Sequence, residues 1–165
     1  MIVRVNDFGA VGDGQMLCTE AFAAAVEAVS GAGGGTVVVP PGRWLSGMIR
    51  LRDHVELHVG RGAVIIASAR PEDHLPLCKS AGGSGDHWHK DEESFHLVLA
   101  QGCTDVALTG SGRLDGNGPV WYDDQDGSLA WPLAKDTNWR RMGALVLIRA
   151  SPTDITYFHD IFYVV

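Results

Sequence analysis

The sequence lacks paired cysteines and any long apolar run. Its three cysteines are widely spaced and contain no CxxC pair, so neither a disulfide framework nor a thiolate zinc site is indicated. We expect Cys18, Cys78 and Cys103 to be buried free thiols. No segment reaches the ~20 apolar residues that a membrane span requires, so no membrane partner is expected.

Positive charge is also scarce. The chain has 13 Lys and Arg against 20 Asp and Glu, which gives a formal net charge of -7. Domains that bind nucleic acid normally carry a basic stripe for phosphates, so no nucleic-acid partner is expected.

No signal peptide is expected from the amino-terminal residues, because Met1 to Val5 run directly into Asn6 without an apolar core. As sequenced, the chain is expected to be cytoplasmic, or secreted if further residues precede Met1.

Glycine is abundant. The 165 residues include 21 glycines, against a usual share of ~7 %, which indicates many tight turns. A hydrophobic content of 45% with 20% charged residues is typical of a globular chain with a core. The length suits one domain, and we expect residues 1–165 to form a single β-helix domain that is partial.

The stretch at residues 33–47, GGGTVVVPPGRWLSG, predicts a short strand bounded by glycine on one side and proline on the other. Four β-formers at 36–39 follow three glycines, and Pro40-Pro41-Gly42 ends the run because proline cannot donate to a ladder. An unbroken apolar run at 37–39 predicts cover on both faces. Further strands are expected at 47–51, 54–59 and 63–68, and the alternation at 55–59 predicts one solvent-exposed face.

A helix is predicted at about 19–30. Thr19 is a plausible N-cap, and Phe22, Val26 and Val29 recur at the i, i+4 and i+7 positions of one face. We expect this helix to cap one end of a stack of sheets. The glycine-rich residues 7–14 that precede it match no phosphate-binding motif, so a turn is expected there.

The later strands fall at 95–100, 105–109, 112–114, 144–149, 154–158 and 161–165. Two long inserted loops, at about 70–94 and 117–142, separate them. Groups of three short strands with short bends predict an all-β fold, a right-handed parallel β-helix. A β-sandwich is the competing interpretation, which the scarcity of Asn-Gly and Asp-Gly turns disfavours.

Several motifs together resemble polygalacturonases and pectinase-like proteins of glycoside hydrolase family 28, within the pectate-lyase-like β-helix superfamily. They cover about residues 3–122 and are Asn6–Gly14, Thr19 with Ala21-Phe22, the run 33–47, Ile49-Arg50-Leu51, Val55–His58, Gly62-Ala63 and Gly110–Gly118 with Trp121. The opening motif is shared with related lyase-like β-helix domains.

The resemblance implies inverting hydrolysis of α-linked galacturonate chains by aspartates, which requires carboxylates ~6.5–9.5 Å apart. The family's Asn-Thr-Asp, Gly-His-Gly and Arg-Ile-Lys motifs are absent from this sequence. The only Asp-Asp pair, Asp123-Asp124, lies upstream of the expected catalytic position. We therefore assign no catalytic, cofactor-binding or metal-ligating residue in this chain, and expect no cofactor.

The last residues, Ile161–Val165, are apolar with no polar cap behind them, although solenoids need terminal caps. The fold is therefore expected to be truncated at its C-terminus. Truncation, a frameshifted gene end and a naturally shorter relative all remain open.

Three other groups of residues have a possible binding role. The run of Asp86, His87, His89, Asp91, Glu92, Glu93 and His96 could hold a divalent ion, but a solvated loop is favoured because spacing locates no further ligand. Asp123, Asp124, Asp126 and Gly127 suggest part of a calcium loop, yet the EF-hand register is missing, so a turn is favoured. Arg140-Arg141 could bind a carboxylated sugar, although a solvated pair is the default.

The aromatic residues Trp121, Tyr122, Trp131 and Trp139 could stack on sugar rings or pack a loop onto the coils.

Two functions are consistent with the sequence. The first is the N-terminal part of a pectin-type glycoside hydrolase that lacks its catalytic half. The second is a non-catalytic β-helix module that binds carbohydrate or serves as a structural repeat.

Overall fold

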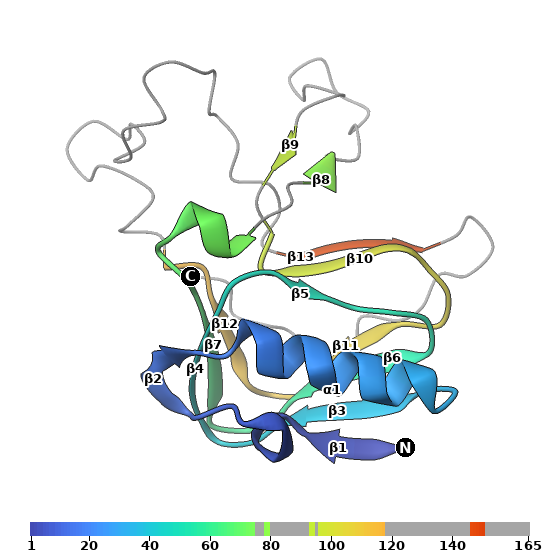
Figure 1. Ribbon diagram of the computed structural model, residues 1–165, viewed down its shortest axis with the longest axis horizontal. Coiled ribbons are helices and arrows are strands. Elements are labelled where there is room, and N and C mark those ends of the chain that lie inside the picture. Colours follow the sequence, from blue (N-terminus) through green and yellow to red (C-terminus); the bar gives the residue numbers. More distant parts are fainter. Residues whose placement is uncertain (75–77, 80–92, 95, 118–145, 151–165) are drawn as a thin grey trace.

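The protein folds as a stack of coils built from short parallel strands (Figure 1). The computed structural model describes residues 1–74, 78–79, 93–94, 96–117 and 146–150. No helix in these ranges is long and apolar enough to cross a bilayer.

Three parallel sheets form the sides of the stack. Sheet A contains, in order, β1 (Ile2–Arg4), β3 (Gly35–Val39), β6 (Val55–Val59) and β11 (Ala107–Thr109). Sheet B contains β2 (Asp13–Leu17), β4 (Gly42–Ser46), β7 (Ala63–Ala67) and β12 (Arg113–Asp115). Sheet C contains β5 (Ile49–Arg50), β10 (Val98–Cys103) and β13 (Val146–Ala150).

Each coil takes one strand from each sheet, in the order β3-β4-β5, then β6-β7-β10, then β11-β12-β13. Every strand pair within the three sheets is parallel. A two-residue hairpin of β8 (Cys78–Lys79) and β9 (Glu93–Ser94) is antiparallel and lies outside them. Because a β-sandwich requires antiparallel sheets, this pairing excludes the competing interpretation and gives the predicted coil of parallel strands.

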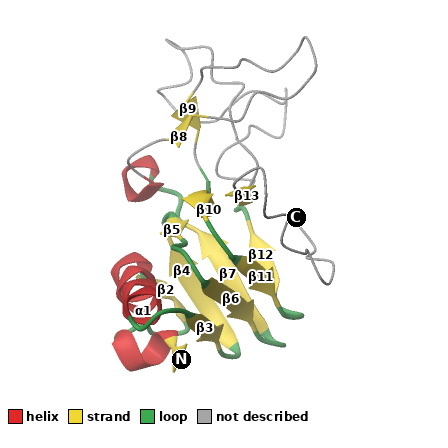
Figure 2. Cartoon of the chain, turned by 90° about the vertical axis from the view of Figure 1, so that its right-hand side faces the viewer, coloured by secondary structure: helices red, strands yellow, loops and turns green. Residues whose placement is uncertain are grey.

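The single α-helix of the described residues, α1 (Thr19–Gly31), begins at the predicted residue and ends one residue later than predicted. It buries Phe22, Val26 and Val29, as its periodicity indicated. In Figure 2 it lies at the end of the stack where β1 begins, and β3, β6 and β11 lie progressively farther from it. The helix therefore caps the first coil.

Thr19 is not the N-cap, which corrects the sequence prediction. Cys18 occupies that position and makes no side-chain capping bond. The Thr19 hydroxyl instead accepts a hydrogen bond of 2.7 Å from the Gly47 amide. This bond ties the start of the helix to the turn between β4 and β5.

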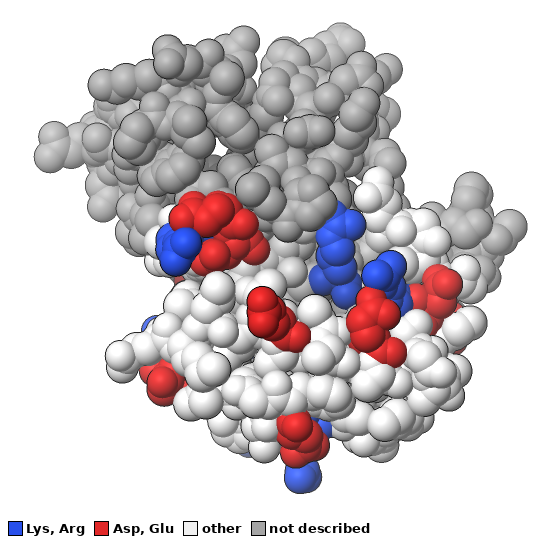
Figure 3. All heavy atoms as spheres, viewed as in Figure 1, with Lys and Arg blue, Asp and Glu red and all other residues white. Residues whose placement is uncertain are grey.

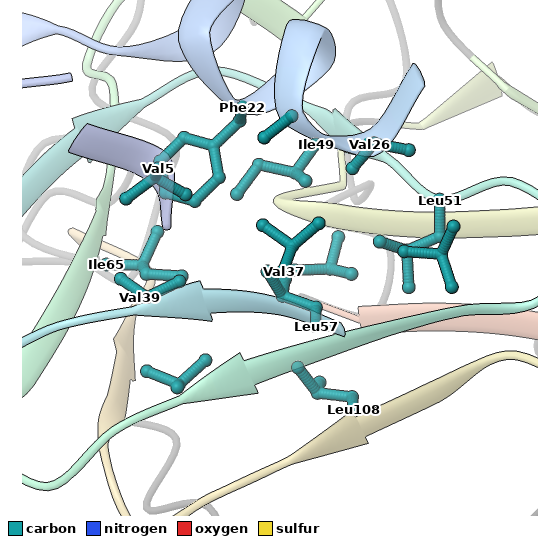
Figure 4. Packing of buried hydrophobic residues seen from close by; sticks show 14 of the residues in the cluster. Val5, Phe22, Val26, Val37, Val39, Ile49, Leu51, Leu57, Ile65 and Leu108 are labelled. Carbon is teal, nitrogen blue, oxygen red and sulfur yellow. The ribbon is translucent and has the colours of Figure 1, made fainter. Parts of the chain in front are cut away.

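The core is a ladder of inward side chains in successive coils. Val37, Leu57 and Leu108 are register partners in sheet A and are 0%, 0% and 2% exposed. Figure 4 shows Phe22 and Val26 from α1 pointing toward this ladder. Burying each such aliphatic side chain contributes about 1.5–3 kcal/mol, so the ladder outweighs the surface hydrogen bonds of the sheets.

The outer face of sheet A is polar and solvent-exposed, as the alternation in 55–59 predicted. Glu56 and His58 are half-buried between buried neighbours. Val38 corrects the expectation of cover on both faces, since it is only half-buried and pairs with His58. Side chains of a strand alternate between faces, so the three consecutive valines reflect β-propensity rather than a second covering layer.

Two strands of sheet B, β2 and β4, were missed from the sequence, as were the two-residue strands β8 and β9 within the first predicted loop. The prolines at 40–41 do end β3, but they form only a corner, and β4 begins at Gly42. Its Trp44 points inward and donates from Nε1 to the Pro40 carbonyl at 2.9 Å. β2 begins within the predicted glycine-rich turn at 7–14, whose first two residues belong to a short 3-10 helix, η1 (Val5–Phe8).

The other predicted strands up to residue 149 overlap observed ones, whereas those at 154–158 and 161–165 lie outside the described residues. Most of the two predicted inserted loops also lies outside them. Within the first, η2 (Pro71–His74) is a second 3-10 helix.

The turns between sheets depend on close approach of the backbones of successive coils and on residues with a left-handed backbone conformation. His54 and Asp105 occupy the same corner in successive coils with φ of 60° and 53°, and His54 Nδ1 lies 3.2 Å from Asp105 Oδ2. At the opposite corner, a Cβ on Gly110 would lie 2.1 Å from the Val59 carbonyl oxygen, and φ of Gly110 is 102°. Only glycine fits that position.

We predict that Gly110→Ala destabilises the protein by about 1–3 kcal/mol, because the added methyl group must displace backbone of the coil below. Gly31→Ala is the matched control, since a Cβ there meets nothing within 4 Å. It should be neutral or stabilising by up to about 1 kcal/mol, because alanine favours helix. Urea unfolding midpoints measure both, and equal values for the two variants would contradict the close approach.

Candidate functional site

Two long connections leave the stack at the same corner. Residues 68–97 join β7 to β10, and residues 116–145 join β12 to β13, so both run from sheet B to sheet C in successive coils. They are equal in length, whereas the other connections between strands of these coils are only a few residues long. Long connections on a rigid scaffold are where binding and catalytic residues concentrate. The described ends of these connections, which we call the B–C corner, are therefore the candidate functional site.

The first connection starts in a buried turn centred on Ser68. The Ser68 amide donates to the Ser46 carbonyl at 2.8 Å, which continues the ladder to the coil below. Its hydroxyl donates to the Asp73 carboxylate and accepts the Arg70 amide at 3.2 Å. These bonds fold η2 back against the end of β7.

His74 joins the two ends of this connection. Its ring is buried, with Nε2 3.0 Å from the Ser68 carbonyl oxygen and Nδ1 3.4 Å from that of His96. His96 is also buried, so the expectation of a solvated loop is wrong for this residue. The reason is its position, because His96 lies where the chain returns to the stack.

The coil below supports both ends. The Met48 amide donates to the Asp73 carbonyl at 3.2 Å, and the Ile49 amide donates to the Leu97 carbonyl at 2.8 Å. A Cβ on Gly47 would lie 1.9 Å from the Asp73 carbonyl oxygen. Glycine at 47 therefore permits the close approach that holds the start of the connection.

Asn117, the second residue of the second connection, has φ of 55°. Its side-chain amide donates from Nδ2 to the Ala67 carbonyl at 3.1 Å, and its backbone amide donates to Asp115 Oδ1 at 3.0 Å. Asparagine tolerates this left-handed conformation better than most residues. Asn117 thus fixes the start of the second connection onto the end of β7, directly beside the start of the first.

Two ion pairs lie at this corner, and their side chains are 25–66% exposed. Arg70 Nε lies 2.9 Å from Glu72 Oε1, and Arg113 Nη2 lies 3.2 Å from Asp115 Oδ2. The pKa of Glu72 is lowered by its own backbone amide and then by Arg70. Exposed pairs of this kind contribute little stability. Figure 3 shows acidic and basic side chains in small separate groups on the described surface in view.

A second polar cluster lies on the outer face of sheet A and spans three coils. Glu56 accepts a hydroxyl bond of 2.8 Å from Thr36 on β3 and another from Thr109 on β11. His58 Nδ1 lies 2.8 Å from Thr109 Oγ1 and 3.6 Å from Glu56 Oε1. Burial raises the pKa of Glu56, but the two hydroxyl bonds and then His58 outweigh it, so the net pKa is below the ordinary value. The Glu56 carboxylate therefore links three successive coils through its hydroxyl bonds.

The residues that the sequence singled out are mostly not placed. Residues 86–92, 121–127, 131 and 139–141 lie outside the described residues, and Glu93 is described only as backbone of β9. Within the described ranges, no group of three or more His, Cys, Asp or Glu side chains could hold a metal ion. Cys18 and Cys103 are buried and free, as predicted, and burial raises the pKa of each thiol.

Sequence reasoning missed the residues that build the B–C corner, namely Ser68, Asp73, His74 and Asn117. Asn117 carries a usable signal, because Asn between two glycines is typical of a left-handed turn. His74 carries none, since its partners are carbonyl groups brought near by the stacking of the coils.

Several known proteins resemble this chain in sequence and in the arrangement of its coils. No family model matches the chain. A probable polygalacturonase from Vitis vinifera is 37% identical over 121 residues, which are 70% of this chain and 24% of that protein. The solved hyperthermoactive exopolygalacturonase from Thermotoga maritima aligns with a TM-score of 0.61 and 40% identity, over 70% of this chain and 25% of that one. The family 28 exopolygalacturonase from Yersinia enterocolitica aligns with a TM-score of 0.59 and 27% identity, over 81% of this chain and 24% of that one.

The coils and these structural neighbours confirm the predicted right-handed parallel β-helix, with α1 as its N-terminal cap. The chain is thus a parallel β-helix protein of the pectate-lyase-like kind. Within that class it is polygalacturonase-like, as its motifs indicated. It spans about a quarter of the length of each of these relatives.

At the B–C corner, we predict that Asn117→Ala costs about 2 kcal/mol, because it removes the bond to Ala67 and leaves a Cβ in a left-handed conformation. Asn117→Gly also removes that bond but adopts the same backbone conformation without strain, so it should cost about 1 kcal/mol less. Chemical denaturation of both variants measures the difference. Equal losses would show that the left-handed backbone at 117 is not under constraint.

On sheet A, we predict that Glu56→Gln costs roughly 1 kcal/mol at neutral pH, since a charged acceptor of two hydroxyl bonds is lost and the side chain is 34% exposed. The folded-state pKa lies below the ordinary 4.5, so this stabilisation is present above that value and disappears as pH falls through the folded pKa.

Thermal unfolding of the wild type and the Glu56→Gln variant between neutral and acid pH should therefore converge on the acid side. Glu27→Gln is the control, because Glu27 pairs only with exposed Arg52 and should show a much smaller gap at any pH. A constant gap for Glu56→Gln across the range would contradict the role given to its charge.

Proposed function

We propose that the chain is the N-terminal part of a polygalacturonase-like glycoside hydrolase that acts on pectic, galacturonate-type polysaccharide by inverting hydrolysis. The observation that carries this proposal is the alignment with polygalacturonases over about a quarter of their length, joined to a matching coil structure. In this proposal the catalytic carboxylates lie outside this chain, and residues 1–165 contribute one part of a single β-helix domain.

The chemistry of the described carboxylates supports this division. Inverting hydrolysis needs one carboxylic acid to protonate the leaving oxygen and a second, ~6.5–9.5 Å away, to activate water. The carboxylates at the B–C corner and on sheet A already hold structural bonds, as Asp73 does with Ser68, Asp115 with Asn117 and Glu56 with two threonines. In this proposal these carboxylates serve as structural links between segments of the β-helix.

What the described part supplies is a scaffold for substrate contact. Successive coils are ~4.8 Å apart, so equivalent positions along the B–C corner form a regular row on one side of the stack. Ser68, His74 and Asn117 fix where the two long connections begin. A long polymer laid along the stack would meet both connections in turn.

A second function from a different class is a non-catalytic β-helix module that binds carbohydrate. The structural role of the described carboxylates is as consistent with this function as with the hydrolase. A binding module needs the same scaffold but no pair of catalytic carboxylates. The two proposals differ in the residues that the gene encodes after Val165.

The test combines an assay with the coding DNA. We expect the purified chain to release no new reducing ends from polygalacturonate, and the downstream codons to encode Asn-Thr-Asp and Gly-His-Gly. The protein extended through those codons should then hydrolyse polygalacturonate with inversion, measured by reducing-end release and by NMR of the anomeric product.

Two outcomes would redirect the assignment. Polygalacturonate binding by the chain in affinity electrophoresis, with no downstream motifs in any frame, would establish the binding module instead. Turnover by the 165-residue chain that Asp124→Asn abolishes would show that the catalytic group lies within it, against the proposal.

A further inference from the structure

The ring of His74 lies between the two ends of the first long connection, residues 68–97. Both of its nitrogens face backbone carbonyl oxygens. Nε2 lies 3.0 Å from that of Ser68, and Nδ1 lies 3.4 Å from that of His96. His74 is 2% exposed, so solvent has little access to either contact. The ring therefore bridges the place where the chain leaves the stack and the place where it returns.

The number of protons on this ring decides how many of the two contacts are hydrogen bonds. Carbonyl oxygens only accept, and a neutral imidazole has one N–H, whereas the protonated ring has two. A neutral ring donates to one carbonyl and turns a nitrogen lone pair toward the other. The contact with Ser68 is the shorter, so the single proton of the neutral ring belongs on Nε2. The bond to the His96 carbonyl is then the one that is lost.

Few charged or titratable groups of the described part surround the ring. Asp73 precedes His74 on η2 and carries a carboxylate, and Glu72 is paired with Arg70 at 2.9 Å. At the return, His96 is the titratable residue, and the supporting turn at residues 47–49 has none. Burial disfavours a charge on the ring, whereas the Asp73 carboxylate and bonds to two carbonyl groups favour it. Both forms of the ring are thus compatible with the fold.

We propose that His74 is a pH-dependent clasp on the first long connection. With two protons, the ring ties both ends of residues 68–97 together. With one proton, it stays bonded to Ser68 at the start and releases His96 at the return. Histidine changes its charge between about pH 5 and 8, so acid closes the clasp and a rise in pH loosens the return end. This inference is independent of the proposed function, because it rests on the contacts of the ring alone.

The experiment is amide hydrogen exchange of the 165-residue chain, followed by NMR between about pH 5.5 and 8. The Ile49 amide reports on the return end, because it donates to the Leu97 carbonyl at 2.8 Å. The Ser68 amide reports on the start, because it donates to the Ser46 carbonyl at 2.8 Å. After correction for intrinsic exchange rates, protection of Ile49 should fall at least about fivefold as the pH rises, since a bond from a charged donor is lost. Protection of Ser68 should change by less than about twofold.

His74→Gln tests whether the proton on this ring causes the effect. Glutamine does not titrate in this range, so the variant should show no pH-dependent protection at Ile49. His54→Gln is the matched histidine control, because His54 is exposed and bonds to the Asp105 side chain rather than to the connection. It should respond to pH as the wild type does.

If His74→Gln does not fold by circular dichroism, the comparison of the Ile49 and Ser68 amides in the wild type decides the proposal. Protection of Ile49 that does not change with pH, or that changes no more than protection of Ser68, would overturn it. An Ile49 response that persists in folded His74→Gln would overturn it as well.

Discussion

In-register stacking of inward apolar side chains is the constraint on which this structure depends. Val37, Leu57 and Leu108 occupy equivalent positions in three coils, and their burial fixes which face of sheet A looks inward. A shift of one residue would turn these side chains outward and bring Glu56 and His58 into the core, at a cost that no surface bond could offset. The same register brings Glu56 between Thr36 and Thr109, so the outer hydrogen bonds result from the inner packing.

The corners transmit that register from one sheet to the next. Gly110 at one corner and His54 with Asp105 at another let the chain turn at the same place in each coil. The B–C corner differs, because there the chain leaves the stack for a long excursion and returns to the next strand in register. The bonds of Ser68, His74 and Asn117 make this possible, since they fix both the departure and, for the first excursion, the return. A polygalacturonase-like chain of this kind can therefore carry long connections without disturbing its coils.

Local pattern was enough to predict much of the fold. The spacing of Phe22, Val26 and Val29 predicted the helix, and alternation at 55–59 predicted the exposed face of sheet A. The motifs around Gly110–Gly118 indicated the class of protein. Local pattern failed where a residue's role depends on a segment far away in the sequence. Thr19 has the residue type of a cap but bonds to Gly47. β4 directly follows two prolines, which favour a turn, and has only Trp44 and Leu45 as apolar residues. His74 takes its partners from the ends of the long connection. Such contacts exist only once the coils have stacked, and no window of sequence contains them.

The two ends of the first long connection, residues 68–97, are held together where the chain leaves and rejoins the stack. His74 holds the carbonyl groups of Ser68 and His96, and the turn at Gly47–Ile49 supports both ends from below. His74 and the residues from His96 onward hold these bonds with the stack, independently of the segment 75–95 between them. That segment is consequently free to lengthen, shorten or be replaced over evolutionary time, while the strands that it connects keep their partners.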